Sequence, residues 1–256
     1  MMRLDKYLVE NGYFETRHQA QNAIKDGHVT IDSRVVMKPA FKVTKTHQIE
    51  LLSTVNPYVS RGGLKLQTAI ELFDLDVRNK AILDIGASHG GFTDCLLNHG
   101  AQAVLAIDVG RDQLHASLRK DERVTLMEET NFLSLSETKI KAFDAAVMDV
   151  SFTSSIPLIT YLFSIKPMPL VVLIKPQFEQ NANTHKGMIK HRRVHVNILN
   201  HYIETLAKQE IFIQKLIPSP IRGSGGDIEF LGYFDEQNKP ATMAVKSVVD
   251  RAYEEA

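Results

Sequence analysis

Hydrophobic residues change their spacing along the chain, and the change predicts two regions of different architecture. From residue 80 onward, apolar runs with the length of buried strands alternate with segments in which apolar residues recur at helical spacing. We expect strands at 81–86, 103–108, 124–128, 143–149 and 170–175, and helices at 91–99, 111–119, 153–163 and 190–209. Strands that alternate with helices in this order indicate an α/β fold with a mostly parallel sheet.

After residue 210 this alternation stops. The segments 211–217 and 228–234 predict two strands around the turn Arg222-Gly223-Ser224-Gly225-Gly226. A short connection of this kind joins antiparallel strands, so the pair would close one edge of the sheet. A last helix is expected at 242–254.

The first 55 residues have a different pattern, which predicts a small α+β domain. Two stretches show helical spacing, and Thr16 with Gln19 forms a capping box for the second helix, which Gly27 would end. Short strand signals follow at 28–31, 35–36 and 49–51. We therefore expect a small domain over 1–55, a linker over 56–64 and a large α/β domain over 65–256.

Composition excludes several classes of protein. The chain has 256 residues, of which 44% are hydrophobic and 23% charged, as in an ordinary globular protein. Its single cysteine, Cys95, cannot form an internal disulfide, and no Cys/His spacing predicts a metal site. Because no apolar stretch has the length of a signal peptide or a membrane span, we expect a cytoplasmic protein without a membrane partner.

Basic residues gather in the small domain although the formal net charge of the chain is zero. Residues 33–47 contain four basic and no acidic side chains. This count alone leaves RNA binding and ordinary solvated charge equally open. If the domain binds RNA, the contacts are expected from Arg3, Lys6, Arg17, Lys25, Arg34, Lys38 and Lys42, with Arg61 from the linker.

The residue pattern of this domain is more informative than its charge. It begins with R-L-D-K-Y-L, continues with T-R-H-Q-A-Q-N-A-I-K-D-G-H-V-T-I-D and ends with V-x-K-P. This pattern resembles the αL RNA-binding domain first known from a ribosomal small-subunit protein. The resemblance implies RNA as a partner.

A glycine loop follows the first strand of the large domain. The strand, the loop and the helix after it form an arrangement typical of nucleotide-binding sites in Rossmann-like folds. The spacing G-x-x-x-G-G differs from the G-x-G-x-x-G of NAD or FAD sites, and Asp84 would attract the cationic groups of S-adenosylmethionine. Asp108 ends the second strand, where an acid binds ribose hydroxyls. The expected cofactor residues are Asp84, Gly86, Ala87, Ser88, Gly90, Gly91, Phe92 and Asp108.

These loop residues also have a purely structural interpretation. Asp84 could cap backbone amides, and Gly90-Gly91 could form an ordinary turn. The spacing to Asp108 favours the cofactor site.

Four charged residues occur where an α/β sheet carries its chemistry, at or near the carboxyl ends of strands. Asp149 and Lys175 each follow a buried apolar run, Lys65 lies ahead of the first strand of the large domain, and Glu229 lies late in the chain. Each of them alone could be a structural or surface charge. A charge at the end of a buried strand needs a partner, so we expect these side chains to pair.

The motifs around these four residues resemble the TlyA family of ribosomal RNA 2′-O-methyltransferases, also called haemolysins, whose catalytic domain has the FtsJ-type fold. The motifs are S-R-G-G-L-K-L, D-I-G-A-S-H-G-G-F-T-D, I-D-V-G, E-E-T-N, M-D-V-S-F, I-K-P-Q-F-E and S-P-I-R-G-S-G-G-D-I-E-F-L. The resemblance implies S-adenosylmethionine as cofactor, cytidine in ribosomal RNA or ribosomal subunits as target, and a catalytic tetrad of Lys65, Asp149, Lys175 and Glu229. It also adds Val109 and Asn131 to the cofactor site.

The residue types of this tetrad suit methyl transfer. A ribose 2′-hydroxyl is a poor nucleophile, so a basic group has to accept its proton. Lys175 is the candidate base, since a neighbouring Lys65, partial burial and a cationic cofactor all favour the neutral amine. Asp149 and Glu229 would hold the lysines and balance their charge, so the four groups titrate together.

Some positions depart from the family pattern. They are His89, Arg111-Asp112, Asp227 and Met188-Ile189-Lys190-His191. They affect the expected cofactor and RNA contacts and leave the tetrad intact. Three other functions stay open on the sequence alone: a membrane-active haemolysin, a non-catalytic RNA-binding protein of the ribosome and, least favoured by the glycine spacing, an NAD-dependent enzyme.

Overall fold

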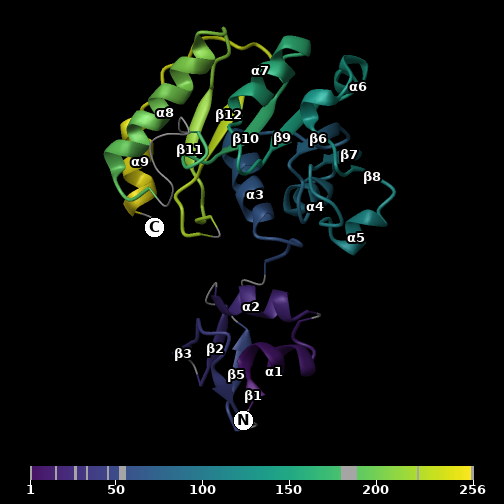
Figure 1. The fold of residues 1–256 in the computed structure, drawn as a ribbon, viewed down its shortest axis with the longest axis vertical. Coiled ribbons are helices and arrows are strands. Elements are labelled where there is room, and N and C mark those ends of the chain that lie inside the picture. Colours follow the sequence, from purple (N-terminus) through teal and green to yellow (C-terminus); the bar gives the residue numbers. More distant parts are fainter. Residues whose placement is uncertain are drawn as a thin grey trace. The chain divides into compact units, whose positions relative to one another are not determined.

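The computed structural model describes residues 2–14, 16–25, 28–32, 34–44, 46–51, 56–179, 189–223 and 225–254 (Figure 1). The chain divides into two compact units, Met1–Pro57 and Tyr58–Ala256. Among the expected features, the helix stop at Gly27 and the turn residue Ser224 lie outside the described residues, as does Met188.

The first unit packs two helices, α1 (Leu4–Glu10) and α2 (Arg17–Lys25), against short antiparallel strands. The strand β2 (Val29–Ile31) pairs with both β3 (Arg34–Val35) and β5 (Ile49–Leu51), while β1 (Met2–Arg3) pairs with β4 (Lys42–Val43). The expected capping box is confirmed. The Thr16 hydroxyl accepts from the Gln19 amide at 3.2 Å, and the Gln19 side chain accepts from the Thr16 amide at 3.0 Å.

The second unit is built on a sheet that has seven strands in the described part of the chain, in the order β11-β12-β10-β9-β6-β7-β8. The parallel strands are β6 (Ala81–Ile85), β7 (Ala103–Ile107), β8 (Val124–Met127), β9 (Ala145–Met148) and β10 (Leu170–Ile174). The closing strands β11 (Lys215–Pro218) and β12 (Phe230–Phe234) are antiparallel. This architecture confirms the expected α/β fold with an antiparallel closing pair.

Helices cover both faces of this sheet because its strands are apolar on both sides. Leu83 and Ile85 face one core with α7 (Ile156–Ile165), α8 (Arg192–Ala207) and α9 (Val245–Glu254). Ile82 faces the other core with α3 (Gly62–Phe73) and α4 (Gly91–Asn98). The shorter elements are α5 (Ala116–Arg119), α6 (Glu137–Lys141) and the 3-10 turn η1 (Phe132–Ser134). None of the helices in the described ranges is long and apolar enough to cross a membrane.

Two expectations about local structure are corrected. The helix expected at 111–119 is confined to α5, because Asp112 has a left-handed backbone with φ +56° and the residues before α5 form a hydrogen-bonded loop. The helix α3 was not expected. It begins at Gly62, within the segment proposed as a linker, and Tyr58 before it is buried in the core of the second unit.

Candidate active site

The four predicted tetrad residues meet at one edge of the sheet. Asp149 follows β9, Lys175 follows β10, Glu229 precedes β12 and Lys65 lies on α3. Nζ of Lys65 lies 2.5 Å from Oε2 of Glu229, and Nζ of Lys175 lies 2.6 Å from Oδ1 of Asp149. The structure therefore joins the four side chains as two ion pairs.

Strand register explains why residues so distant in the sequence meet. In the parallel pair β6 and β9, Ile85 lies opposite Met148, so Asp149 comes directly beside the glycine loop. In the antiparallel pair β10 and β12, Ile174 lies opposite Phe230, so the next residue of one strand and the preceding residue of the other face each other. These two residues are Lys175 and Glu229.

Burial makes these ion pairs electrostatically strong and costly to form. The residues Lys65, Lys175 and Glu229 are 7%, 8% and 4% exposed. Burial raises the pKa of Glu229, and the charges of Lys65 and Lys175 oppose this shift. Because desolvating two charges offsets most of their attraction, buried ion pairs contribute little net stability. Their presence beside a glycine loop is typical of a functional site.

Two residues beside the tetrad were not among the predicted site residues. Nζ of Lys175, which pairs with Asp149, donates a hydrogen bond to Oγ of Ser151 at 2.6 Å. Phe152 is 91% exposed and has a left-handed backbone with φ +64°, and its ring centroid lies 5.2 Å from that of Phe178. The M-D-V-S-F motif contains both residues, but the sequence of the motif does not show that they contact Lys175 and Phe178 in another segment.

The glycine loop between β6 and α4 fits a bound ligand. Gly86 has φ +86°, and a Cβ there would lie 2.5 Å from the carbonyl oxygen of Asp149. Asp84 is fully buried on β6, and its Oδ2 accepts from the Thr93 hydroxyl at 2.6 Å, whereas its Oδ1 has no hydrogen-bond partner among the described residues. Burial raises the pKa of Asp84 to about 7. An unpartnered buried carboxylate oxygen at this position suits a cationic ligand.

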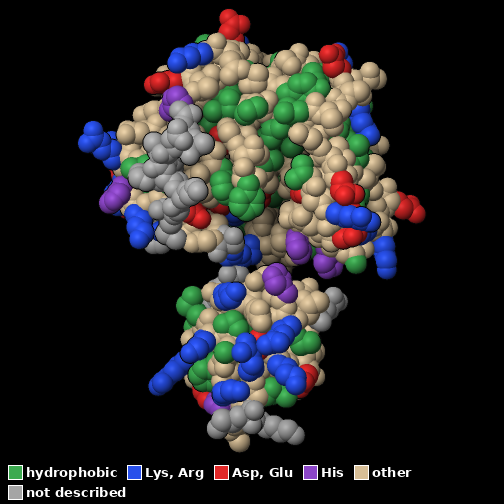
Figure 2. Space-filling view, in the orientation of Figure 1, with side chains coloured by type: hydrophobic (Ala, Val, Ile, Leu, Met, Phe, Trp, Pro, Cys, Tyr) green, Lys and Arg blue, Asp and Glu red, His purple; other side chains and the backbone are tan. Residues whose placement is uncertain are grey.

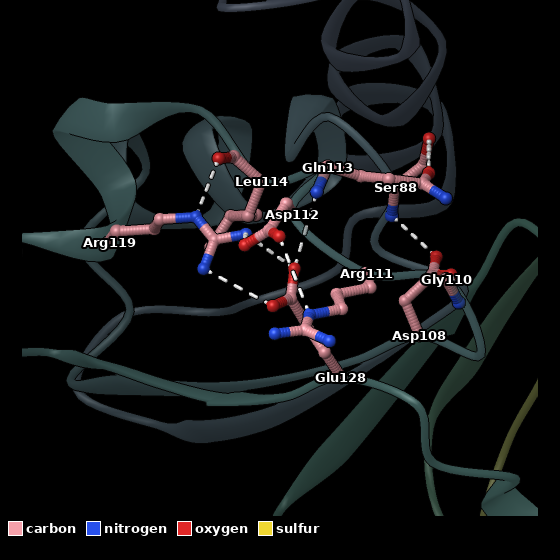
Figure 3. A network of polar contacts seen from close by, with 9 residues as sticks. All are labelled: Ser88, Asp108, Gly110, Arg111, Asp112, Gln113, Leu114, Arg119 and Glu128. Carbon is pink, nitrogen blue, oxygen red and sulfur yellow. Dashed lines mark hydrogen bonds and ion pairs between the residues drawn. The ribbon is translucent and has the colours of Figure 1, made fainter.

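Asp108 joins the glycine loop to the loop after β7 (Figure 3). Its Oδ2 accepts from the amide of Ser88 at 2.8 Å, and its Oδ1 accepts from the amide of Gly110 at 2.7 Å. The Ser88 hydroxyl donates to Oε1 of Gln113 at 3.1 Å. Each carboxylate oxygen keeps a second lone pair, so Asp108 can hold both loops and still accept from a ribose hydroxyl.

A second set of polar contacts supports this loop from the side (Figure 3). Arg119 contacts Glu128 at 2.5 Å and donates to the carbonyl of Leu114 at 3.0 Å. The Arg119 guanidinium lowers the pKa of Glu128, which also accepts from the amide of Gln113 at 3.3 Å. The sequence pattern did not predict these contacts, because Arg119 ends α5 whereas Glu128 follows β8. The two positions that depart from the family pattern, Arg111 and Asp112, pair with each other at 3.5 Å.

The remaining predicted cofactor residues lie in different surroundings. Val109 is largely exposed next to Asp108. Asn131 accepts from the amide of Leu133 at 3.0 Å as the cap of η1. The side chain of Phe92 is buried in the core with α3, so it could contact a ligand of the loop only through its backbone. Ala87, Gly90 and Gly91 complete the loop.

Lys and Arg side chains gather on the face of the first unit that Figure 2 shows, and we call this surface the basic face. Lys6, Lys25, Arg34, Lys38 and Lys42 are exposed, whereas Arg61 belongs to the second unit. Lys6 lies 3.4 Å from Glu10.

The buried carboxylate of Asp5 orients two arginines of this face. It accepts from Arg3 at 3.0 and 2.9 Å and from Arg17 at 3.0 Å. These contacts, those of Arg3 above all, keep the pKa of Asp5 well below its usual value. The two guanidinium groups are therefore held in fixed directions instead of moving freely in solvent.

Comparison with known proteins relates both units to described families. Residues 58–235 match the FtsJ-like methyltransferase family and residues 2–49 match the S4 domain. The chain is 34% identical over 264 residues to the 16S/23S rRNA (cytidine-2′-O)-methyltransferase TlyA of Mycobacterium tuberculosis, with 99% of this chain and 97% of the relative covered. It is 39% identical over 239 residues to Hemolysin A of Brachyspira hyodysenteriae, with 91% and 99% covered.

A solved structure from Streptococcus thermophilus that carries the hemolysin name is also similar. It has a TM-score of 0.77 and 35% identity, and the match covers 99% of this chain and 96% of that one. The similarity therefore extends over both units, in sequence and in fold.

Proposed function

The chain belongs to the FtsJ-like methyltransferase family, and we propose that it transfers a methyl group from S-adenosylmethionine to the 2′-hydroxyl of a cytidine in ribosomal RNA. The observation that carries this proposal is the cluster of Lys65, Asp149, Lys175 and Glu229 directly beside the glycine loop, in which both lysines and Glu229 are buried. The name of the M. tuberculosis relative supports the choice of ribose and of cytidine.

Residues of the loops after β6 and β7 would hold the cofactor. The unpartnered oxygen of Asp84 attracts positive charge, and Asp108 accepts from the ribose hydroxyls. S-adenosylmethionine supplies an activated methyl group. The close contact between Gly86 and Asp149 joins the cofactor loop to the tetrad, so the methyl donor and the proton acceptor act at neighbouring positions.

Within the tetrad, we assign proton acceptance to Lys175, which takes the proton of the ribose hydroxyl at Nζ when that nitrogen carries a free lone pair. Oδ1 of Asp149 and Oγ of Ser151 hold this nitrogen at 2.6 Å each. Lys65 and Glu229 form the second pair and set the local charge, because the carboxylate of Glu229 lies within the field of both lysines. With the cofactor bound, the 2′-oxygen would lose its proton to Nζ of Lys175 and gain the methyl group, whose bond to the cofactor sulfur would break.

The S4 unit binds RNA, and the tetrad acts on an unpaired nucleotide. The basic face with its anchored Arg3 and Arg17 suits a phosphate backbone. Beside the tetrad, the exposed ring of Phe152 offers a surface on which a base can stack. The enzyme then acts on ribosomal RNA or ribosomal subunits in the cytoplasm.

The test is transfer of radiolabelled methyl to purified ribosomal subunits of each kind. We expect label in RNA with the intact chain and with Lys246→Ala, a control at an exposed surface position. The rate of labelling should be at least about 100-fold lower with Lys175→Ala, in line with the loss of a general base. Cofactor binding by Lys175→Ala should change by less than about 2-fold, since Lys175 contacts Asp149 and Ser151 and not the cofactor loop.

Alkaline hydrolysis of the labelled RNA identifies the methylated atom. A 2′-O-methyl group blocks cleavage of the adjacent bond, so the label should remain in dinucleotides, whereas methylated bases would appear in mononucleotides. Binding of cofactor and RNA without any transfer would favour a non-catalytic RNA-binding protein instead. Normal turnover by Lys175→Ala would refute its assignment as the base.

A further inference from the structure

Glu179 is a buried carboxylate that the proposed chemistry does not use. It is 8% exposed and lies in the segment 175–179 that follows β10. Its oxygens accept three hydrogen bonds, from the hydroxyl of Ser154 at 2.5 Å and from the amide and hydroxyl of Ser155 at 2.9 and 2.7 Å. The Ser155 hydroxyl in turn lies 2.8 Å from the hydroxyl of Tyr202 on α8. A buried carboxylate needs such donors, and here all three come from one segment.

The segments 149–155 and 175–179 are joined at three points, and Glu179 makes the last of them. At the first point Lys175 contacts Asp149 and Ser151. At the second the ring of Phe178 contacts that of Phe152. Both segments follow neighbouring parallel strands, β9 and β10, so each carries part of the tetrad at one end. Glu179 closes the far end of this contact.

The 149–155 segment needs such a restraint. Phe152 has φ +64°, a conformation that a bulky L-residue rarely adopts without support from its surroundings. The helix α7 begins directly after Ser155, which gives it no capping side chain, and the first turn has no acidic residue. The hydroxyl of Ser154, which Glu179 holds, accepts from the amide of Ile156 at 3.2 Å. The carboxylate of Glu179 meets this helix end from another segment, where negative charge is favourable.

We propose that Glu179 is a positioning residue, which fixes the 149–155 segment so that Asp149 and Ser151 hold Lys175 and Phe152 keeps its exposed ring beside the tetrad. This inference rests on the proposed methyl transfer for its effect on rate. Without Glu179, the 149–155 segment should also become more mobile, whatever the substrate is.

Three variants test the effect on rate. We expect Glu179→Ala to lower kcat about 30-fold, since a misplacement of about 1 Å can cost 100-fold, while KM for S-adenosylmethionine stays within about 2-fold. Glu179→Gln should recover kcat to within about 3-fold, because its carbonyl still accepts from Ser155 and the Ser154 hydroxyl can rotate to accept from its amide. Tyr202→Phe removes a hydroxyl from the same buried chain but leaves the three bonds to Glu179, so it controls for general destabilisation.

A fluorescent reporter tests the position of the segment without any turnover. The chain contains no tryptophan, so Phe152→Trp places a single tryptophan on the 149–155 segment, whose emission can be excited apart from that of the tyrosines. Its fluorescence anisotropy should fall when Glu179→Ala is added and return with Glu179→Gln. If the wild type transfers no methyl group but the anisotropy follows this pattern, the positioning role stands and the proposed substrate fails.

Two results would overturn the inference itself. One is an unchanged anisotropy with Glu179→Ala. The other is a loss of kcat in Glu179→Ala that is no larger than in Tyr202→Phe at equal thermal stability.

Discussion

The charge of Asp84 should make the folded state less stable as the pH rises, and Asp84→Asn should remove this effect. Asp84 is fully buried, and its Oδ1 has no hydrogen-bond partner in the described structure. Burial is the main reason that its pKa lies at about 7, and the hydrogen bond from Thr93 opposes it only in part. In the unfolded chain the same carboxyl has a pKa of about 3.9.

The sign follows from proton binding. Between about pH 4 and pH 7 the folded chain keeps a proton on Asp84 that the unfolded chain has lost, so the free energy of unfolding decreases as the pH rises through this window. One pKa unit corresponds to about 1.4 kcal/mol. With these two pKa values, the ionisation of Asp84 lowers the free energy of unfolding by roughly 2 kcal/mol more at pH 8.5 than at pH 5.5. For a domain of this size the difference is roughly 4–8 °C in Tm.

Calorimetry of the wild type and Asp84→Asn at both pH values measures this difference. The asparagine carbonyl can still accept from Thr93, and any cost of its unpaired amide does not change with pH. Other titrating groups occur in both proteins, so they cancel when the two are compared. We expect the advantage of Asp84→Asn over the wild type to grow by roughly 2 kcal/mol from pH 5.5 to pH 8.5. An advantage that is equal at the two pH values would refute the assignment of a raised pKa to Asp84.

The same substitution should act in the opposite direction on cofactor binding. A cation bound near Asp84 favours its ionised form, so binding to the wild type near pH 7 should release a proton. Titration calorimetry in two buffers of different ionisation enthalpy detects that proton. Asp84→Asn should bind S-adenosylmethionine at least about 10-fold more weakly, as expected for the loss of a charge-assisted contact, and without proton release.

Two further predictions concern the RNA-binding face and the C-terminal helices. The double change Lys38→Gln and Lys42→Gln should reduce the slope of log affinity for ribosomal RNA against log salt by roughly 1 to 2, while Lys246→Gln leaves it unchanged in filter-binding assays; an unaltered slope would mean that these lysines are only solvated surface charges. Burial lowers the pKa of His195, so from about pH 6.5 downward the unfolded chain binds a proton that the folded chain takes up only at lower pH, and stability should fall over that window. Urea unfolding at pH 7.5 and 5.5 should show a smaller loss for His195→Gln than for the wild type, and equal losses would exclude His195 as the cause.

Much of the fold and the tetrad could be predicted because both depend on local pattern. Buried parallel strands are continuous apolar runs, and a charge directly after such a run, as at Asp149 and Lys175, is visible in one sequence. The same reasoning should have found α3, in which Leu66, Ala69, Ile70 and Phe73 follow helical spacing and are buried.

Helical spacing also bears on one predicted cofactor residue. Phe92, Cys95 and Leu96 share one face of α4 and are buried together. The side chain of Phe92 is thereby committed to the core, although its position directly after Gly91 suggested the ligand loop. Periodicity was the stronger signal at this position.

Contacts between distant segments could not be predicted in this way. Glu179 contacts Ser154 and Ser155, which lie 25 and 24 positions earlier in the chain. Arg119 at the end of α5 contacts Glu128 directly after β8. Their hydrogen bonds depend on the positions of loops, which no period of 2 or 3.6 residues encodes. The loop before α5 shows the consequence, since its polar contacts prevail over the helical pattern that predicted a longer helix.

The direction of β12 is the part of the fold on which the tetrad most depends. The four tetrad residues lie on or next to four different elements. The strand β12 brings Glu229 to Lys175 only because it runs antiparallel to β10, with Phe230 opposite Ile174. A parallel strand in the same place would present the residue after Phe234 at this edge of the sheet. Glu229 then reaches back to Lys65 on α3, across 164 positions of the chain. The position of Glu229 in the second ion pair therefore depends on how β12 joins the sheet, so the same strand that closes the sheet also completes the site.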